Sequence, residues 1–253
     1  MSDEKDILNI YWAPAITARK TDDHKWFNNL GQYAYPNMRT LQSDLMQDKN
    51  PHRGPSTYLS CPAATTIFKN TVVMYNAINC EYKYDLSDFD NIRFEPKSNP
   101  SLNVSIPRPP ARINKPTVEF QLRWLFFAEE PVIMRVTPPM FHPPKYTKYA
   151  SCVPGQYDIG RWIRPVSFEL QMWEDVGEIK FEEGEPLMYA TFETDKKIKL
   201  QRFMVSDALE NHVLDGLVRT FGQNLGLEER YEIFENSSLK DIILKEIRSN
   251  LVG

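Results

Sequence analysis

The chain has 253 residues, of which 42% are hydrophobic and 25% are charged, and its formal net charge is -4. These proportions are ordinary for a globular protein, and a chain of this length buries enough apolar surface to fold as one large domain without disulfides. The charge balance excludes bulk electrostatic attraction to nucleic acid. No stretch approaches the ~20 apolar residues that span a bilayer.

The cysteines and the N-terminus indicate where the protein resides. Cys61, Cys80 and Cys152 are odd in number and widely spaced, which favours free thiols in a reducing cytosol over disulfides or a zinc site. The first residues are acidic and lack the basic start and apolar run of a signal peptide. We therefore expect a cytoplasmic protein.

The N-terminal half predicts short strands separated by irregular segments. In chain order we expect first a strand over 7–12, stopped by Pro14, and then a long ordered arm over 17–55 that contains a short helix over 38–46. A turn or single helical turn is expected over 61–71. Strands are expected over 72–75, 80–84 and 91–95. The four prolines of residues 106–116 remove ladder donors, so that segment is expected to be an extended, polyproline-like connection.

Residues 117–126 carry the clearest pattern in the chain. Apolar side chains at every second position, from Val118 to Phe126, alternate with polar ones. This period of two predicts a strand with one buried face and one solvent-exposed face. A turn at 128–130 then predicts that this strand forms a hairpin with a strand over 132–136.

A second alternating strand is expected over 162–173. Farther along, Gly184 supplies the positive φ that a tight turn needs, so strands over 179–181 and 187–192 are predicted to form a hairpin. The alternation of a strand over 198–205 changes phase at 201–202, as it does at a β-bulge.

Two helices are expected after residue 205. Ser206 is a good N-cap, apolar side chains recur every four residues from Leu209 to Phe221, and Gly226 is expected to end this helix. Ser238 opens the second helix. The apolar face of the second helix consists of Leu239, Ile242, Ile243, Ile247 and Leu251.

The sequence therefore predicts a mainly β fold, with an antiparallel β-sandwich or barrel-like body of about 8–11 strands and two C-terminal α-helices. Residues 1–205 are expected to form the β-rich body with its long N-terminal arm. Residues 206–253 are expected to form a helical appendage packed on that body.

No residue pattern identifies a reaction. None of the four histidines has an acidic residue two positions later, which argues against a non-haem iron site. The nucleophile elbow and the glycine-rich phosphate loops are also missing from the sequence. We assign no catalytic residue, no metal ligand and no cofactor.

A proline-stiffened loop over 137–149 carries the first candidate binding residues, Phe141, His142 and Tyr146. Rigid aromatic loops make good contact surfaces, because little side-chain entropy is lost when they are ordered. The alternative is a loop that packs back on its own body.

The second candidate group follows shortly afterwards. Arg161, Trp162 and Arg164 precede a strand and suit the recognition of an anion or a partner, or a structural salt bridge with Glu169. Glu169 and Glu185 are also candidates as a carboxylate pair, the arrangement that glycoside hydrolysis uses. The alternative for the acidic turn around Glu185 is a solvated hairpin.

Residues 153–192 contain a Pro-Gly turn, a tryptophan, an alternating strand that ends in tryptophan, a phenylalanine and a Gly-Glu-Pro turn. These positions are Pro154, Gly155, Trp162, Trp173, Phe181, Gly184, Glu185 and Pro186. The pattern resembles an uncharacterised domain family of bacteria and tailed phages, many of them marine. The loop before Trp162 departs from the family pattern. The resemblance implies a β-rich fold and a phage-linked origin, and it transfers no catalytic residue.

Two functions follow as expectations. The first is a non-catalytic binding or structural protein of phage-linked origin, either a minor virion component or a host-interacting factor, with a protein as partner and neither membrane nor nucleic acid involved. It would reside in the host cytoplasm or in the virion. The alternative is a carboxylate-based enzyme on a β-sandwich, for example a hydrolase of saccharides, in which Glu169 and Glu185 converge near Arg164 and Trp162 with raised pKa values. The sequence leaves the oligomeric state open.

Overall fold

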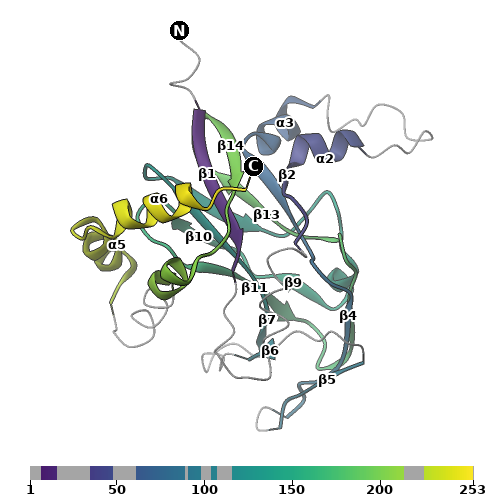
Figure 1. Ribbon diagram of the computed structural model, residues 1–253. Coiled ribbons are helices and arrows are strands. Elements are labelled where there is room, and N and C mark those ends of the chain that lie inside the picture. Colours follow the sequence, from purple (N-terminus) through teal and green to yellow (C-terminus); the bar gives the residue numbers. More distant parts are fainter. Residues whose placement is uncertain are drawn as a thin grey trace.

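The structure is a computed structural model, and it describes residues 7–15, 35–47, 61–88, 91–97, 104–106, 116–213 and 225–252. Most of the arm expected over 17–55 and of the connection expected over 106–116 lies outside these residues. The described residues form three sheets with helices on two sides, α2 and α3 on one and α5 and α6 on another (Figure 1).

The first sheet is built around its longest strand. Its strands are β1 (Ile7–Pro14), β6 (Val104–Ser105), β7 (Thr117–Ala128), β9 (Ala150–Cys152), β11 (Pro165–Met172) and β14 (Lys197–Arg202). Their order is β14-β1-β7-β11-β9, and β6 pairs with β7. The pair β1–β14 is parallel, an exception to the expected antiparallel pairing. β1 continues through Pro14, which pairs with Trp124.

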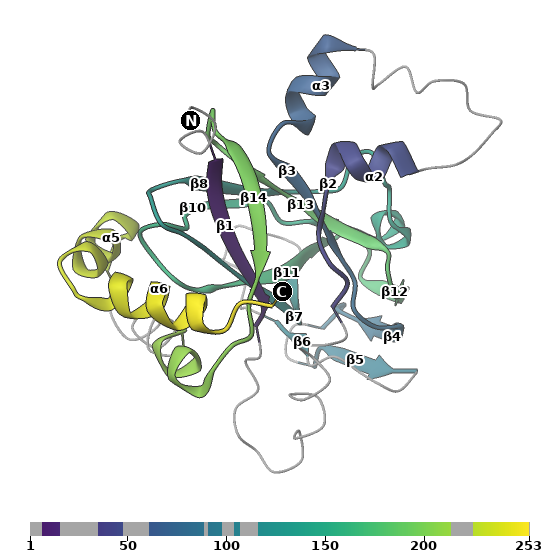
Figure 2. The same ribbon diagram turned by 45° about the horizontal axis from the view of Figure 1, so that its top comes forward.

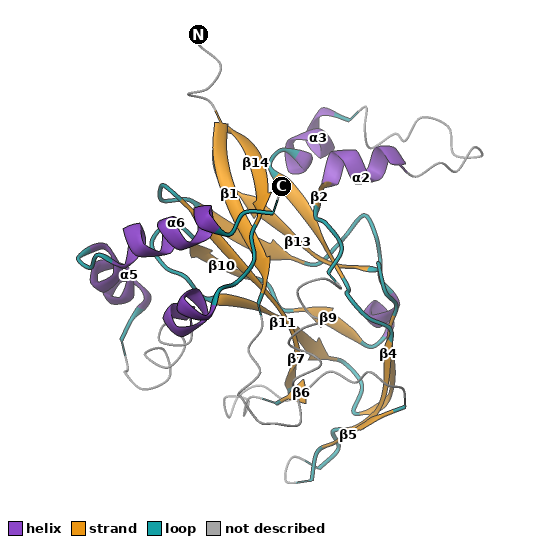
Figure 3. Ribbon diagram, in the orientation of Figure 1, coloured by secondary structure: helices purple, strands orange, loops and turns teal. Residues whose placement is uncertain are grey.

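The other two sheets complete the body (Figure 3). The second sheet has the order β10-β8-β13-β3-β2, with β2 (Arg39–Thr40), β3 (Thr71–Tyr75), β8 (Ile133–Thr137), β10 (Gly155–Asp158) and β13 (Pro186–Phe192). The third has the order β12-β4-β5, with β4 (Cys80–Asp85), β5 (Arg93–Pro96) and β12 (Val176–Phe181). The helical segments beside the second and third sheets are α2 (Leu41–Gln47), α3 (Pro62–Phe68) and the 3-10 helix η3 (Lys145–Lys148).

Aromatic side chains from all three sheets share one core. The alternation over 117–126 is confirmed, because the apolar positions of β7 up to Trp124 are buried and the polar ones between them are half-exposed. Phe120 of β7 meets Phe181 of β12 with ring centroids 4.8 Å apart, and Phe126 meets Phe192 of β13 at 5.9 Å. The mainly β, sandwich-like fold is therefore confirmed.

The described residues contain fourteen strands, more than the eight to eleven expected. The difference comes from very short strands, because β2 and β6 have two residues each and β9 has three. Strands this short carry too few residues to show a period of two, so sequence patterning does not reveal them.

Both predicted hairpins are wrong. β7 belongs to the first sheet and β8 to the second, so the turn at 128–130 crosses between sheets. In the same way β12 pairs with β4, whereas β13 pairs with β3 and β8. Gly184 does adopt the expected positive φ, +77°. Alternation identifies a strand but not its partner, and a short connection serves a crossing between stacked sheets as well as a hairpin.

The bulge expected at 201–202 is also wrong. β14 pairs with β1 in one unbroken register, from Ile7–Lys197 to Trp12–Arg202. The change of phase marks the end of the strand instead, since Phe203 makes only an isolated bridge to Leu251.

The C-terminal region consists of helical residues 207–213 followed by α5 (Leu227–Glu235) and α6 (Leu239–Ser249). Ser206 caps the first segment as expected, because its hydroxyl accepts a hydrogen bond from the Leu209 N–H at 3.2 Å. Gly226 begins α5 rather than ending a helix, and its N–H donates to the Glu229 carboxylate at 2.7 Å. α5 was not expected from the sequence.

The buried face of α6 differs from the predicted one. Ile243, Leu244 and Ile247 are buried, whereas Ile242 and Leu251 are 41% and 40% exposed. The C-terminal helices pack on the outer side of the first sheet (Figure 2). The shared apolar cluster includes Tyr11, Ala13, Leu125, Phe127 and Phe203 from the sheet side, and Leu209, Val213, Phe234, Ile243, Leu244 and Ile247 from the helices. None of the helices described here has the length and apolarity to cross a membrane.

Substitution of Phe127 tests how much the packing of the C-terminal helices on the first sheet contributes to the free energy of unfolding. The Phe127 ring is buried and lies 6.1 Å from the ring of Phe234 on α5. We expect Phe127→Ala to lower the free energy of unfolding by about 3–5 kcal/mol, because it leaves a cavity between sheet and helices. Urea unfolding followed by circular dichroism measures this change. A loss below about 1 kcal/mol would show that the helices contribute little to the stability of the body.

Candidate functional site

A cleft of about 240 Å³ lies between β10 of the second sheet and β11 of the first. The cleft forms where the chain crosses between the first and second sheets twice. The chain leaves the first sheet after β9, enters the second as β10, and returns through residues 159–164 to β11. Pro154 lies at the first crossing and has no N–H to donate to a ladder. The polar and aromatic residues that line the cleft include Gln156, Tyr157, Trp162, Arg164, Ser167 and Glu169.

Trp162 forms a fixed wall of the cleft. It is 7% exposed, and its ring centroid lies 6.2 Å from that of Tyr157 in an edge-to-face arrangement. The guanidinium carbons of Arg164 and Arg230 lie 5.1 and 5.6 Å from the Trp162 ring centroid. The Tyr157 hydroxyl donates to the backbone carbonyl of Arg164 at 3.3 Å. Cation–π and ring contacts therefore hold this wall before any ligand arrives.

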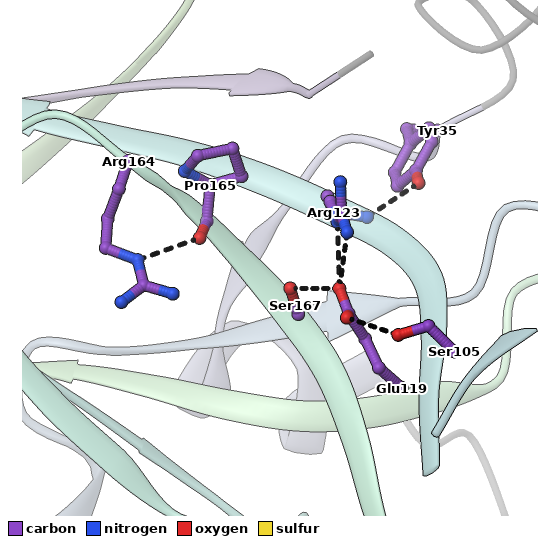
Figure 4. Close-up of polar contacts among 7 residues, drawn as sticks. All are labelled: Tyr35, Ser105, Glu119, Arg123, Arg164, Pro165 and Ser167. Carbon is purple, nitrogen blue, oxygen red and sulfur yellow. Dashed lines mark hydrogen bonds and ion pairs between the residues drawn. The ribbon is translucent and has the colours of Figure 1, made fainter. Parts of the chain in front are cut away.

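Arg164 makes no salt bridge with an acidic side chain among the described residues, although its charge acts on Glu169 and opposes the rise in the pKa of that carboxyl. Its Nε donates only a long hydrogen bond, 3.4 Å, to the carbonyl of Pro165 (Figure 4). Glu169 lines the same cleft but makes no salt bridge with Arg164, so the Arg164 guanidinium is able to receive an anionic group.

Glu169 has a carboxylate neighbour that the sequence did not reveal. It lies directly opposite Glu119 in the ladder between β11 and β7. Glu119 accepts hydrogen bonds from Arg123 at 2.6 and 3.0 Å, from the Ser167 hydroxyl at 2.7 Å and from the Ser105 hydroxyl at 3.0 Å (Figure 4). Glu169 makes no side-chain hydrogen bond or ion pair with any residue that the structure describes.

The two environments shift the carboxyl pKa values in opposite directions. Burial and the neighbouring charge of Glu119 outweigh the opposing charges of Arg164 and Arg123 and raise the pKa of Glu169 above its ordinary value. Burial alone would raise the pKa of Glu119 too, but the hydrogen bonds from Ser167, Arg123 and Ser105 and the charge of Arg123 outweigh it and lower that pKa. Glu119 is thus held as a carboxylate, whereas Glu169 accepts a proton more readily.

The strand register explains why the sequence did not identify Glu119. The period of two placed Glu119 and Arg123 on the polar face of β7, which is a correct placement. Their proximity to Glu169 depends on which strand pairs with β7 and in which register, and a period of two determines neither.

The structure brings Trp162, Arg164 and Glu169 together but does not bring Glu185 to them. Glu185 closes its own turn, where its carboxylate accepts hydrogen bonds from the Lys145 N–H at 2.7 Å and the Glu182 N–H at 3.1 Å. It is not among the residues that line the cleft. The expected convergence of Glu169 with Glu185 is therefore wrong, because hydrogen bonds hold the Glu185 carboxylate in its own turn, outside the cleft.

Arg161 is engaged in a structural ion pair. Its guanidinium donates two hydrogen bonds to Glu235 of α5, at 2.8 and 2.9 Å, and its guanidinium carbon lies 4.7 Å from the ring centroid of Tyr231. The structural salt bridge expected with Glu169 is thus made with Glu235 instead. Arg161 anchors α5 rather than facing the cleft.

The loop over 137–149 packs back on the body, which was the alternative to an open contact surface. The ring of Phe141 lies 5.1 Å from that of Phe68. The His142 ring contacts the Tyr189 hydroxyl at 2.7 Å and the Asp44 carboxylate at 3.0 Å. Tyr146 is fully buried, and its hydroxyl donates to a backbone carbonyl. Phe141, His142 and Tyr146 therefore stabilise the loop.

The cysteines do not extend the site. All three are free, and Cys80 and Cys152 are buried. Burial raises the pKa of each of these two thiols to about 12, which leaves them unreactive. Within the described parts of the chain, no three His, Cys, Asp or Glu side chains are grouped so that they could hold a metal ion.

The opposite pKa shifts predict opposite effects of two matched substitutions. A raised pKa in the folded state means that ionisation of Glu169 opposes folding, so stability is lost as the pH rises through that pKa. Glu169→Gln should therefore raise the free energy of unfolding at neutral pH. Glu119 stabilises the fold above its unfolded pKa and loses this contribution as the pH falls, so Glu119→Gln should lower the free energy of unfolding at neutral pH.

Urea unfolding of both variants and the unaltered protein, at neutral pH and again in acid, measures these differences. The two differences should shrink in acid, where both carboxyls are protonated in the unaltered protein. Effects of the same sign at neutral pH would contradict the assignment of opposite pKa shifts.

Comparison of the chain with protein-family models, with curated proteins and with solved structures finds no match.

Proposed function

We propose that this protein acts by binding a partner protein in the cleft between β10 and β11. One observation carries the proposal: Arg164 and Glu169 line the same cleft, and neither side chain makes a salt bridge with a described residue, although the charge of Arg164 is close enough to act on Glu169. Partly buried charges are normally paired, because desolvation without a partner costs free energy. A ligand that places an anionic group on Arg164 would recover part of that cost.

The rigidity of the walls supports the same proposal. Trp162 and Tyr157 are fixed by contacts with the body, so little conformational entropy is lost when a ligand binds. Aromatic and arginine side chains are also the residue types that contribute most to protein interfaces.

The resemblance of residues 153–192 to a domain family of bacteria and tailed phages suggests which partner to look for. That segment includes both walls of the cleft. We propose a virion component or a host protein as the partner, met in the host cytoplasm or in the assembled particle.

Site-specific photo-crosslinking tests this proposal. A photoreactive amino acid at Gly155, where a side chain would enter open space, should capture a discrete partner protein. The same amino acid at Lys199, an exposed position on the far edge strand of the first sheet, serves as the control. Capture should weaken when Arg164→Gln is added. Equal capture from Gly155 and Lys199, or capture insensitive to Arg164→Gln, would contradict a partner site in the cleft.

A second candidate function is favoured by the carboxylate pair. Two opposed carboxyls with pKa values shifted apart are the usual arrangement of a general acid and a negatively charged partner, as in glycoside hydrolysis. Here Glu169 would be the acid and Glu119 the carboxylate, in place of the pair with Glu185 expected from the sequence.

Incubation with a panel of bacterial polysaccharides tests the hydrolase. Turnover should fall by roughly a hundredfold or more in Glu169→Gln, because a general acid contributes on that scale. Detection of new reducing ends measures turnover. No turnover by the unaltered protein on any glycan of the panel would count against this candidate.

A further inference from the structure

We infer that the cleft takes an extended acidic peptide, which adds as a strand to the free edge of β10 and places a carboxylate on Arg164. This inference rests on the proposed function and specifies the form of the partner segment. Its basis is the direction of the backbone groups of β10 together with the Arg164 guanidinium, which lines the same cleft and makes no salt bridge with a described residue.

The free edge of β10 follows from its hydrogen bonds. Within the described residues β10 has a neighbouring strand on one side only, β8. Ile159, which follows β10, donates its N–H to the Val132 carbonyl at 3.1 Å in the register that pairs Gly155 with Val136. In an antiparallel ladder the direction of the backbone groups alternates, so those of Gln156 and Asp158 point away from β8.

The backbone N–H of Asp158 confirms that backbone directions alternate along β10, and it is already occupied, so it is not available to a partner strand. The Asp158 N–H donates to the hydroxyl of Tyr231 on α5 at 2.7 Å. Among the described residues, none hydrogen-bonds to the backbone N–H or C=O of Gln156, so both remain for a partner strand, and Gln156 is exposed and lines the cleft. Another extended peptide is the partner best suited to such a donor–acceptor pair on a strand edge.

The charges of the cleft favour an acidic peptide over a basic one. Arg164 brings a guanidinium to the cleft, whereas burial and Glu119 outweigh the charges of Arg164 and Arg123 and raise the pKa of Glu169. The guanidinium of Arg230 lies against the other wall residue, Trp162, and adds positive potential. A carboxylate on the peptide would meet a guanidinium, and Glu169 would weaken its binding to the extent that Glu169 is ionised.

Selection from a displayed library of random linear peptides supplies the probe. Selected peptides are synthesised with a fluorescent label, and their Kd for the full chain is measured by fluorescence anisotropy. We expect the enriched sequences to share an acidic residue. Enrichment of sequences without one would overturn the inference.

Two substitutions at one position isolate the backbone contact. Gln156→Pro removes the outward N–H, and Gln156→Ala removes only the side chain. Because that N–H points away from β8, proline there breaks no bond of the ladder. We expect the peptide to bind roughly tenfold more weakly to the proline variant than to the alanine variant. Equal Kd values would overturn strand addition.

Two further substitutions test the charges and remain informative if the proline variant fails to fold. Arg164→Gln should weaken binding of the acidic peptide roughly tenfold or more, and Glu169→Gln should strengthen it several-fold. An unchanged Kd for Arg164→Gln would overturn the inference.

The failures of the two proposals are distinguishable. Suppose that a partner is captured from Gly155 in a way that depends on Arg164, but that the two variants of Gln156 have equal Kd values for the peptide. The proposed function would then remain, and strand addition would be refuted. Failure of both capture and peptide selection would refute the proposed function itself. Glycan binding at the cleft in place of peptide binding would refute strand addition in favour of a saccharide ligand.

Discussion

The structure depends on β7, the strand that has a packed partner on each of its sides and faces. Its inward side chains, such as Phe120 and Trp124, form the centre of the core. On its outward face Leu125 and Phe127 receive the C-terminal helices. Burial on this scale stabilises a fold far more than any single polar contact. Because β7 is fixed in this way, it also fixes the register of β11, and with it the place of Glu169 in the cleft.

The outward face of the same strand changes character along its length. Leu125 and Phe127 lie under the helices, whereas Glu119 and Arg123 form a polar cluster near the cleft. An ion pair that is mostly buried costs desolvation, which hydrogen bonds must offset. Glu119 has such bonds from two serines and an arginine. Glu169 has none among the described residues, and this asymmetry between two opposed carboxyls is why only one of them is available to a ligand or a proton.

The sequence pattern correctly predicted features that depend only on residues close together in the chain. The alternation from Val118 to Phe126 predicted a one-sided strand, Ser206 predicted a cap, and Gly184 predicted a positive φ. It did not predict which strands pair, so both hairpins and the partner of Glu169 were assigned wrongly. Tryptophan and arginine before β11 pointed to the cleft correctly. The edge of β10 carries no sequence signal, because an edge is defined by a missing neighbour rather than by the residues of the strand.

A bare strand edge is a hazard for a protein, since it invites pairing with any other chain. Here one of the two outward positions of β10 is protected, because Tyr231 satisfies the Asp158 N–H and the ion pair between Arg161 and Glu235 holds α5 in place. The protection stops at Gln156, in the same cleft as Arg164, which makes no salt bridge with a described residue. Exposed backbone groups and an unpaired charge are each unfavourable alone. Their occurrence side by side, against a rigid aromatic wall, is the arrangement that selects one short acidic strand over the many that an open edge would accept.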